Sequence, residues 1–74
     1  MKLPRISGRE LCNVLEKIGF VKTYGKGSHV RFKHVDGRKT VVPVHGNEEL
    51  GRGLIGEILK QIGLTREEFL GLIG

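Results

Sequence analysis

Two short stretches of the sequence combine histidine with glycine and positive charge. The stretch YGKGSHVRFKH contains His29 and His34, and the stretch PVHG contains His45. Histidine exchanges protons most readily near neutral pH, so these three side chains are the candidates for acid–base chemistry without a metal. His29 also follows a glycine-rich loop and precedes Arg31 and Lys33, so it is the strongest candidate of the three, with an unremarkable surface histidine as the alternative.

Other kinds of site fit the sequence poorly. A zinc site is not expected, because the chain has one cysteine and no pair of histidines at helical spacing. Ser28 and His29 cannot act as a nucleophile and its base, because neighbouring residues of a strand point to opposite faces. The loop at residues 25–28 is not a nucleotide-binding P-loop, because a strand follows it. Its glycines instead expose backbone amides to a phosphate, or simply form a hairpin loop. Tyr24 either stacks on a base or packs on the sheet.

Three strands are expected to position these residues, at about residues 20–24, 29–35 and 38–44. Asp36-Gly37 predicts a two-residue hairpin turn between the second and third strands. That turn pairs Phe32 with Val41 and Val30 with Pro43 on a buried face.

Alternation along the second strand then turns His29, Arg31 and Lys33 outward together. The same register places Val44 opposite His29, so His45 is expected near His29. His34 is expected opposite Lys39 on the packed face, in a structural role.

Helices are indicated before and after these strands in the sequence. Ser7 and Glu10 form a predicted capping box at the start of a helix that ends before Gly19. A second helix is expected from about residue 52 to Gly63. A second capping box at residues 65–68 begins a short last helix. The expected fold is α+β, with the order α-β-β-β-α plus a short C-terminal helix, and with the helices on one face of a three-stranded antiparallel sheet.

Length and charge limit the function. The chain has 74 residues, so we expect a single domain over residues 1–74 whose active site is a shallow surface feature. It carries 13 Lys and Arg against 8 Asp and Glu, a net charge of +5, which favours nucleic acid, an anionic membrane or an acidic protein as partner. A basic surface exposed only to solvent is the alternative.

The compartment is also indicated by the sequence. The only cysteine, Cys12, excludes an internal disulfide and is expected to be a half-buried packing residue. The sequence has no apolar run long enough for a membrane span and no signal peptide, so we expect a cytoplasmic protein.

Taken in order, the motifs resemble those of the HicA family of bacterial toxins. Lys26-Gly27-Ser28-His29 is similar to the G-S-H signature of that family, and Pro43-Val44-His45-Gly46 is similar to its P-x-H-G signature. The segments at residues 58–64 and 67–70 resemble its C-terminal pattern. The chain departs from the pattern at Arg52 and Leu54, where family members often carry Pro and Thr.

The resemblance implies a fold like that of double-stranded-RNA-binding domains and a ribonuclease acting on mRNA, with His29 as its essential histidine. It also implies a HicB-type antitoxin as partner. The expected reaction is a metal-independent transesterification without a cofactor, in which His29 is the base or the acid. His45 or a lysine is the candidate for the second proton-transfer group. The expected RNA-binding residues are Lys26, Gly27, Ser28, Arg31 and Lys33. A non-catalytic RNA-binding module using the same face, and an adaptor for an acidic protein, are the alternatives.

Overall fold

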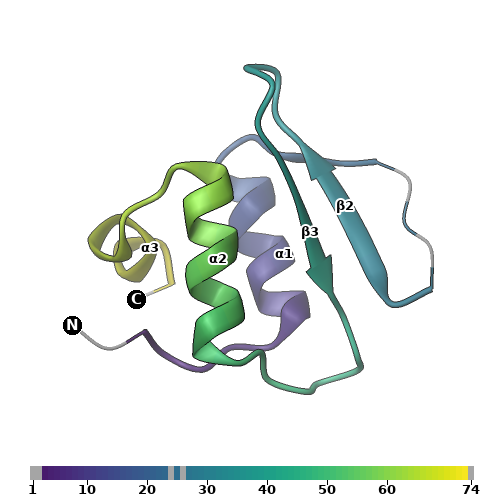
Figure 1. Cartoon of the computed structure of the whole chain (residues 1–74), viewed down its shortest axis with the longest axis vertical. Coiled ribbons are helices and arrows are strands. Elements are labelled where there is room, and N and C mark those ends of the chain that lie inside the picture. The colour runs from purple at the N-terminus through teal and green to yellow at the C-terminus, as the bar shows by residue number, and fades with distance from the viewer. Residues whose placement is uncertain (1–2, 24, 26, 74) are drawn as a thin grey trace.

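The computed structural model describes residues 3–23, 25 and 27–73, which form three helices and one antiparallel sheet (Figure 1). The strands lie side by side in the order β1-β2-β3, and the fold is α+β, as the sequence predicts. This arrangement is consistent with the fold of double-stranded-RNA-binding domains. None of the helices in the described ranges is long and apolar enough to cross a membrane. In chain order the elements are α1 (Gly8–Lys17), β1 (Val21–Lys22), β2 (His29–Lys33), β3 (Lys39–Pro43), α2 (Arg52–Ile62) and α3 (Arg66–Ile73).

The predicted capping box begins α1. The Ser7 amide donates to Glu10 Oε1 and the Glu10 amide donates to Ser7 Oγ, each over 3.2 Å. The helix ends because Gly19 adopts a left-handed conformation, with φ of 96°, and the Phe20 amide donates to the Leu15 carbonyl over 3.0 Å. Local sequence therefore determines both ends of α1.

The end of α2 and the start of α3 also follow local signals. Gly51 precedes α2 without a side-chain cap, and Gly63 ends it with φ of 69°. The second predicted capping box is present before α3, where the Glu68 amide donates to Thr65 Oγ1 and the Thr65 amide donates to Glu68 Oε1. The hydrogen bond from the Thr65 amide is the main cause of a pKa of the Glu68 carboxyl below its ordinary value.

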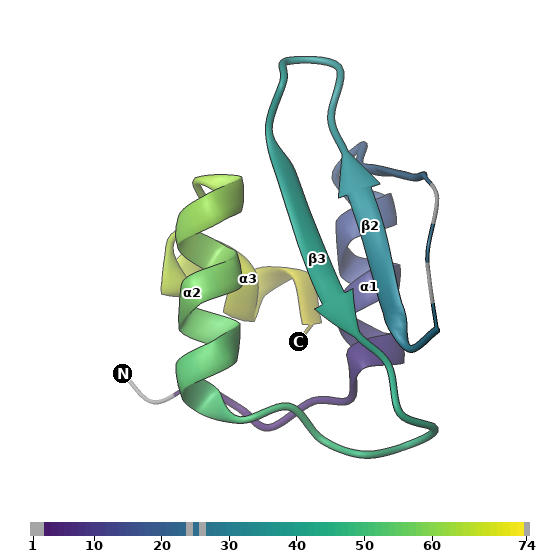
Figure 2. The same ribbon diagram turned by 45° about the vertical axis from the view of Figure 1, so that its right-hand side comes forward.

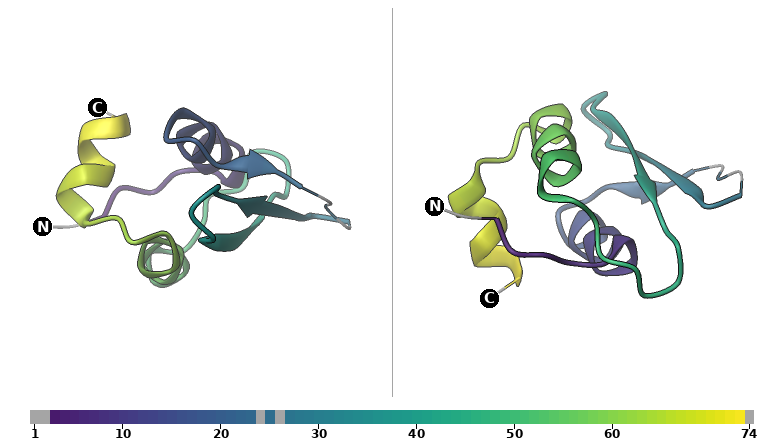
Figure 3. Two further views of the ribbon diagram at one scale, coloured as in Figure 1. Left: turned by 90° about the horizontal axis from the view of Figure 1, so that it is seen from above. Right: turned by 60° about the horizontal axis from the view of Figure 1, so that its bottom comes forward.

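Helices α1 and α2 pack on one face of the sheet, and α3 lies on their far side (Figures 1 and 3). The N-terminal segment also joins the core, which the sequence did not predict. Leu3 and Ile6 are buried, and the Ile6 carbonyl accepts a hydrogen bond of 2.8 Å from the Leu50 amide. The buried apolar residues form one cluster: Leu3, Ile6, Leu11, Val14, Leu15, Phe20, Phe32, Val42, Leu50, Ile55, Ile58, Leu59, Ile62 and Phe69.

The turn between β2 and β3 differs from the prediction. The His34 amide donates to the Arg38 carbonyl and the Gly37 amide donates to the His34 carbonyl, each over 2.9 Å. Three residues, 35–37, therefore form the loop, and only Gly37 among them has a positive φ, of 98°. A three-residue hairpin loop normally combines a common turn with one left-handed residue in this way. The predicted two-residue turn is wrong, and the register shifts by one residue.

The shifted register changes which side of β3 is buried. Phe32 pairs with Thr40 and Val30 pairs with Val42 on the face that meets the helices. Val42 is fully buried, whereas Val41 is 40% exposed. The predicted burial of Val41 is therefore wrong, as are the pairings that the two-residue turn implied.

His34 and Arg38 attach the hairpin to the helices. The His34 ring is half-buried, with Nε2 3.3 Å from the Ile18 carbonyl oxygen and its edge against the Phe20 ring. The Arg38 guanidinium lies 5.1 Å from the centre of the same ring and donates to the Ile62 carbonyl. His34 thus lies opposite Arg38, not Lys39, and its contacts are those of a structural residue.

Candidate functional site

Strand β2 presents one row of polar side chains to solvent. His29, Arg31 and Lys33 are exposed, whereas Val30 is half-buried and Phe32 is 2% exposed. The helices cover the other face of the sheet, so alternation alone directs these three side chains away from the core. The structure therefore has the exposed row that the sequence predicted.

The register of β3 extends this row across the sheet. Lys39 lies opposite Lys33, Val41 opposite Arg31, and Pro43 opposite His29. We call these six residues the uncovered sheet face. Lys39 was predicted on the packed side, so this placement is a correction that adds a cation to the uncovered sheet face.

The uncovered sheet face carries three positive charges on two neighbouring strands. Lys33 and Lys39 are directly opposite each other, and two like charges in that position destabilise a sheet. Within the described part of the chain, no ion pair joins Arg31, Lys33 or Lys39 to a carboxylate. An arrangement of cations that costs stability and lacks counter-charges suits an anionic ligand.

The glycine-rich loop leads directly into His29. Gly27 is exposed with φ of 62°, and the half-buried Ser28 accepts a hydrogen bond of 2.6 Å at its carbonyl from the Val44 amide. This bond continues the pairing of β2 with β3 one residue beyond both strands and fixes the backbone before His29. The candidate residues Lys26 and Tyr24 lie outside the described residues.

His45 lies at the same end of the sheet as His29. It is exposed, and its carbonyl accepts a hydrogen bond of 3.0 Å from the Glu48 amide. It follows Pro43, the partner of His29, by two residues, or about 7 Å along an extended chain. The two backbone segments therefore lie at one end of the sheet, and the predicted proximity of the two histidine side chains stays a prediction.

The first residue of α1 fixes the end of β3. Gly8 is buried against Pro43, and a Cβ atom added at Gly8 would lie 2.1 Å from the Pro43 carbonyl oxygen. Only glycine allows this approach without displacement of the backbone. Because Pro43 pairs with His29, α1 indirectly positions His29. Sequence reasoning missed this contact, since Gly8 stood out only as part of a capping box.

An open groove of about 730 Å³ lies between the uncovered sheet face and α2. The ribbons of β3 and α2 lie side by side in Figure 2. Arg31, Lys33, Lys39 and Val41 line it from the sheet. The side of α2 contributes Leu54, Glu57 and Gln61. The α2 residues were not predicted as site residues. Leu54 carried the one available signal, since it is apolar but lies off the buried stripe of α2.

Two further features bear on the chemistry of the molecule. Cys12 is half-buried, and burial raises the pKa of its thiol, as expected for a packing residue. Across residues 3–23, 25 and 27–73, no three His, Cys, Asp or Glu side chains gather as ligands for a metal ion.

Comparisons with known proteins agree with the motifs. The model of a family described as the HicA toxin of bacterial toxin–antitoxin systems matches residues 8–64. A curated protein of Pseudomonas fluorescens strain Pf0-1, named probable mRNA interferase HicA, is 50% identical to the chain over 40 residues. Those residues make up 54% of this chain and 65% of the relative, so the match leaves about a third of the relative uncovered.

Proposed function

Because the chain belongs to the HicA toxin family, we propose that it is the toxin of a type II toxin–antitoxin system and cleaves mRNA in the cytoplasm. One observation carries the proposal: His29 shares the uncovered sheet face with three cations that form no ion pair with a carboxylate of the described residues. The relative named as an mRNA interferase supports the substrate class. The net charge of +5 is also that expected of a protein that binds a polyanion.

In the proposed reaction the RNA provides its own nucleophile. The 2′-oxygen attacks the neighbouring phosphorus, a 2′-O–P bond forms, and the P–O5′ bond breaks. The products are a 2′,3′-cyclic phosphate and a 5′-hydroxyl. The proton lost by the 2′-hydroxyl and the proton gained by the 5′-oxygen are the two transfers that need a catalyst. His29 performs one of them, and His45 or a lysine is the candidate for the other.

The neighbouring residues hold the substrate. Arg31 follows His29 on the same face by about 7 Å, so its guanidinium is within reach of the phosphates that flank the reacting one. Lys33 and Lys39 continue the positive charge along the strand. Gly27 and Ser28 bring the backbone close to the RNA at the other side of His29, and Lys26 is the further candidate for a phosphate contact in that loop.

The ends of the cleavage products test this function. Purified protein is incubated with single-stranded RNA in excess EDTA, and the new ends are analysed by mass spectrometry. Cleavage with 2′,3′-cyclic phosphate and 5′-hydroxyl ends is expected. RNA that is bound but remains intact, with or without divalent ions, would favour the non-catalytic RNA-binding module. Cleavage that EDTA abolishes would contradict the metal-independent reaction.

We propose that a HicB-type antitoxin inhibits the toxin by binding to the uncovered sheet face. Such a partner should present acidic or polar groups to Arg31 and Lys33, and this complementarity should speed its association. Binding of the antitoxin and binding of RNA are then mutually exclusive. The measurement is a competition titration with a fluorescent RNA whose 2′-hydroxyls are blocked by methylation. A ternary complex in which RNA remains bound at saturating antitoxin would refute this mode of inhibition.

A further inference from the structure

We propose that the groove between β3 and α2 receives a base of the bound RNA and that the side-chain amide of Gln61 recognises the edge of that base. The inference deepens the proposed function and rests on it, because it assumes that the uncovered sheet face binds a single RNA strand. It assigns Gln61, Val41 and Leu54 to substrate specificity. Val41 and Leu54 lie outside the motifs that carry the resemblance. Gln61 lies in the matching segment at residues 58–64, but the resemblance implies no role for it.

A hydrogen bond from the core holds Gln61 in position. Thr40 is 4% exposed, and its Oγ1 donates to Gln61 Oε1 over 2.7 Å. With its oxygen engaged by Thr40, the amide has two N–H donors left, and Gln61 lines the groove. These two donors have no acceptor among the described residues. A glutamine with one end fixed and the other end available is suited to a hydrogen-bond acceptor on a base.

Two apolar side chains complete the surface for a base. Val41 projects from β3 and Leu54 from α2, and each is 40% exposed. Exposed large apolar residues on both walls of one groove favour a flat, apolar ligand face. The face of a base has this character, and unpaired bases of single-stranded RNA are available for such contacts.

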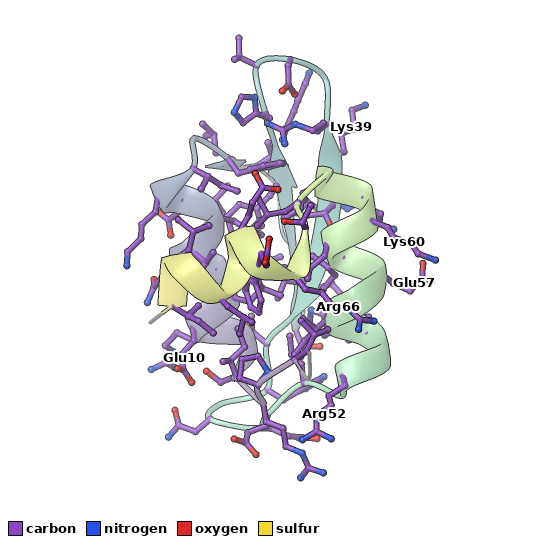
Figure 4. All side chains as sticks on the ribbon, turned by 90° about the vertical axis from the view of Figure 1, so that its left-hand side faces the viewer. Glu10, Lys39, Arg52, Glu57, Lys60 and Arg66 are labelled. Carbon is purple, nitrogen blue, oxygen red and sulfur yellow. The ribbon has the colours of Figure 1, made fainter. Side chains whose placement is uncertain are left out.

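The charge of the groove identifies RNA as its occupant in preference to an apolar protein segment. Arg31, Lys33 and Lys39 line it. Among the described residues the one carboxylate that does so is that of Glu57, whose Oε1 lies 3.9 Å from Lys60 Nζ. Figure 4 shows Lys39 extending from β3 and Glu57 from α2 on the same side of the molecule. Cations beside an apolar surface match a ligand that has phosphates beside bases. A strand with its reacting phosphate at His29 would reach the groove within a few nucleotides.

Binding of uncleavable RNA tests the groove. The dissociation constants of the wild-type protein are measured for single-stranded 2′-O-methyl oligonucleotides of equal length made of adenine, cytosine or uracil. We expect unequal constants. Gln61→Ala should reduce the ratio of the largest to the smallest dissociation constant by about 2- to 12-fold. This is the range that one hydrogen bond contributes. Asn13→Ala removes an exposed amide from α1 and is the matched control, with an unchanged ratio.

Two further variants, with one control, separate recognition from folding. Thr40→Val keeps the volume of the buried side chain but removes the hydroxyl that holds Gln61, so it should weaken discrimination as Gln61→Ala does. Val41→Thr should weaken binding of all three oligonucleotides. Val35→Thr, at a hairpin position that is 97% exposed and outside the groove, should not. Melting temperatures confirm that each variant is folded at the assay temperature.

The outcomes distinguish this inference from the proposed function. Equal dissociation constants for the three oligonucleotides in the wild-type protein would overturn recognition of the base, as would a ratio that survives both Gln61→Ala and Thr40→Val. Either result would leave cleavage of unmodified RNA by the wild-type protein intact. Failure of the wild-type protein to cleave or bind any RNA would instead refute the proposed function itself.

Discussion

At the scale of single residues, the uncovered sheet face is the feature that most needs a ligand. Lys33 and Lys39 repel each other across β2 and β3, and the structure provides no carboxylate to them within its described residues. A sheet that needed only stability would place opposite charges or β-branched residues at such a pair. We therefore interpret this pair as a phosphate-binding position whose repulsion is relieved when RNA is bound.

The salt dependence of RNA binding tests Lys33. Each phosphate contact on single-stranded nucleic acid makes log K fall by about 0.7 per unit of log salt concentration. Lys33→Ala should therefore lower the slope by about 0.7 without changing base preference. Because it also removes the repulsion with Lys39, it should not lower the melting temperature.

The matched control for this prediction is Lys17→Ala, which removes an exposed lysine from the last turn of α1, away from the sheet. Its salt slope should equal that of the wild-type protein. A slope that Lys33→Ala leaves unchanged would remove Lys33 from the residues that contact phosphate.

The sequence predicts which side chains of β2 are exposed but not which side chains of β3 are, and the reason is physical. On β2 the apolar residues Val30 and Phe32 alternate with polar residues, so only one face can be buried. On β3 the neighbours Val41 and Val42 are both apolar, so either can be placed in the core. Asp36-Gly37 suits a two-residue or a three-residue loop, and the structure has the latter. Lys39 and Val41 could therefore not be assigned to a face in advance.

At the scale of elements, the contact between α1 and β3 determines where His29 lies. Gly8→Ala would place a methyl carbon 2.1 Å from the Pro43 carbonyl oxygen, so the backbone must move. Such overpacking typically costs about 1–3 kcal/mol, and we expect a loss of that size in the free energy of unfolding measured in urea. Cleavage of RNA should also slow, because the strand opposite His29 shifts.

Gly56→Ala is the control for this substitution. Gly56 lies inside α2, and a Cβ atom added there meets no described atom within 4 Å beyond its chain neighbours and the backbone of its own helix. Alanine favours a helix by about 1 kcal/mol over glycine, so this variant should be as stable as the wild-type protein or more stable. Equal stability of Gly8→Ala and the wild-type protein would show that the close approach of α1 to β3 is not required.

The hairpin loop is expected to make the stability depend on pH. Asp36 accepts hydrogen bonds from the Arg38 amide over 3.0 Å and from Arg38 Nε over 2.8 Å, and the amide bond is the main cause of a lowered carboxyl pKa. A pKa that is lower in the folded state means that the ionised carboxylate stabilises the fold above its ordinary pKa. That stabilisation is lost as the pH falls through the folded pKa.

Asp36→Asn should therefore reduce the part of the unfolding free energy that the wild-type protein loses on acidification. Urea unfolding at neutral pH and at a series of acidic pH values measures it. Glu16→Gln replaces an exposed carboxylate of α1 that forms no ion pair within the described part of the chain, and it should leave the pH dependence unchanged. An identical pH dependence in Asp36→Asn and the wild-type protein would exclude Asp36 as a source of acid sensitivity.

Elements with local signals were predictable, and those that depend on distant partners were not. The two capping boxes and Gly19 act within a few residues, so the sequence alone indicates them. Leu3 and Ile6 show no helical or strand periodicity, and only the folded chain shows that they pack in the core. The hydrogen bond of Thr40 joins residues 21 positions apart, so the buried polar position on β3 and the orientation of Gln61 were beyond sequence reasoning.

At the scale of the whole molecule, the division of the sheet into a covered and an uncovered face explains how so short a chain can carry a site. Helices α1 and α2 use one face to build the core, and α3 packs beyond them (Figure 3). A core of this size has little room for an internal cavity, so chemistry must take place on an open surface. RNA suits such a surface for two reasons. Exposed cations can bind the phosphates of RNA, and RNA carries its own nucleophile.

The central claim is that His29 transfers a proton during cleavage of RNA, and the most direct measurement is the cleavage rate of purified His29→Ala. Its side chain is exposed, so the variant should melt within a few degrees of the wild-type protein. His34→Ala is the matched histidine control. It removes the contacts with Phe20 and Ile18, so it should lower the melting temperature but retain cleavage at temperatures where it is folded.

We predict that His29→Ala binds RNA as the wild-type protein does but cleaves it about 10²- to 10⁴-fold more slowly, the usual effect of losing a general acid or base. His45→Ala, measured in parallel, shows by the size of its own loss whether His45 is the second proton-transfer group. Cleavage by folded His29→Ala at the wild-type rate would contradict the account and leave RNA binding as the function of the uncovered sheet face.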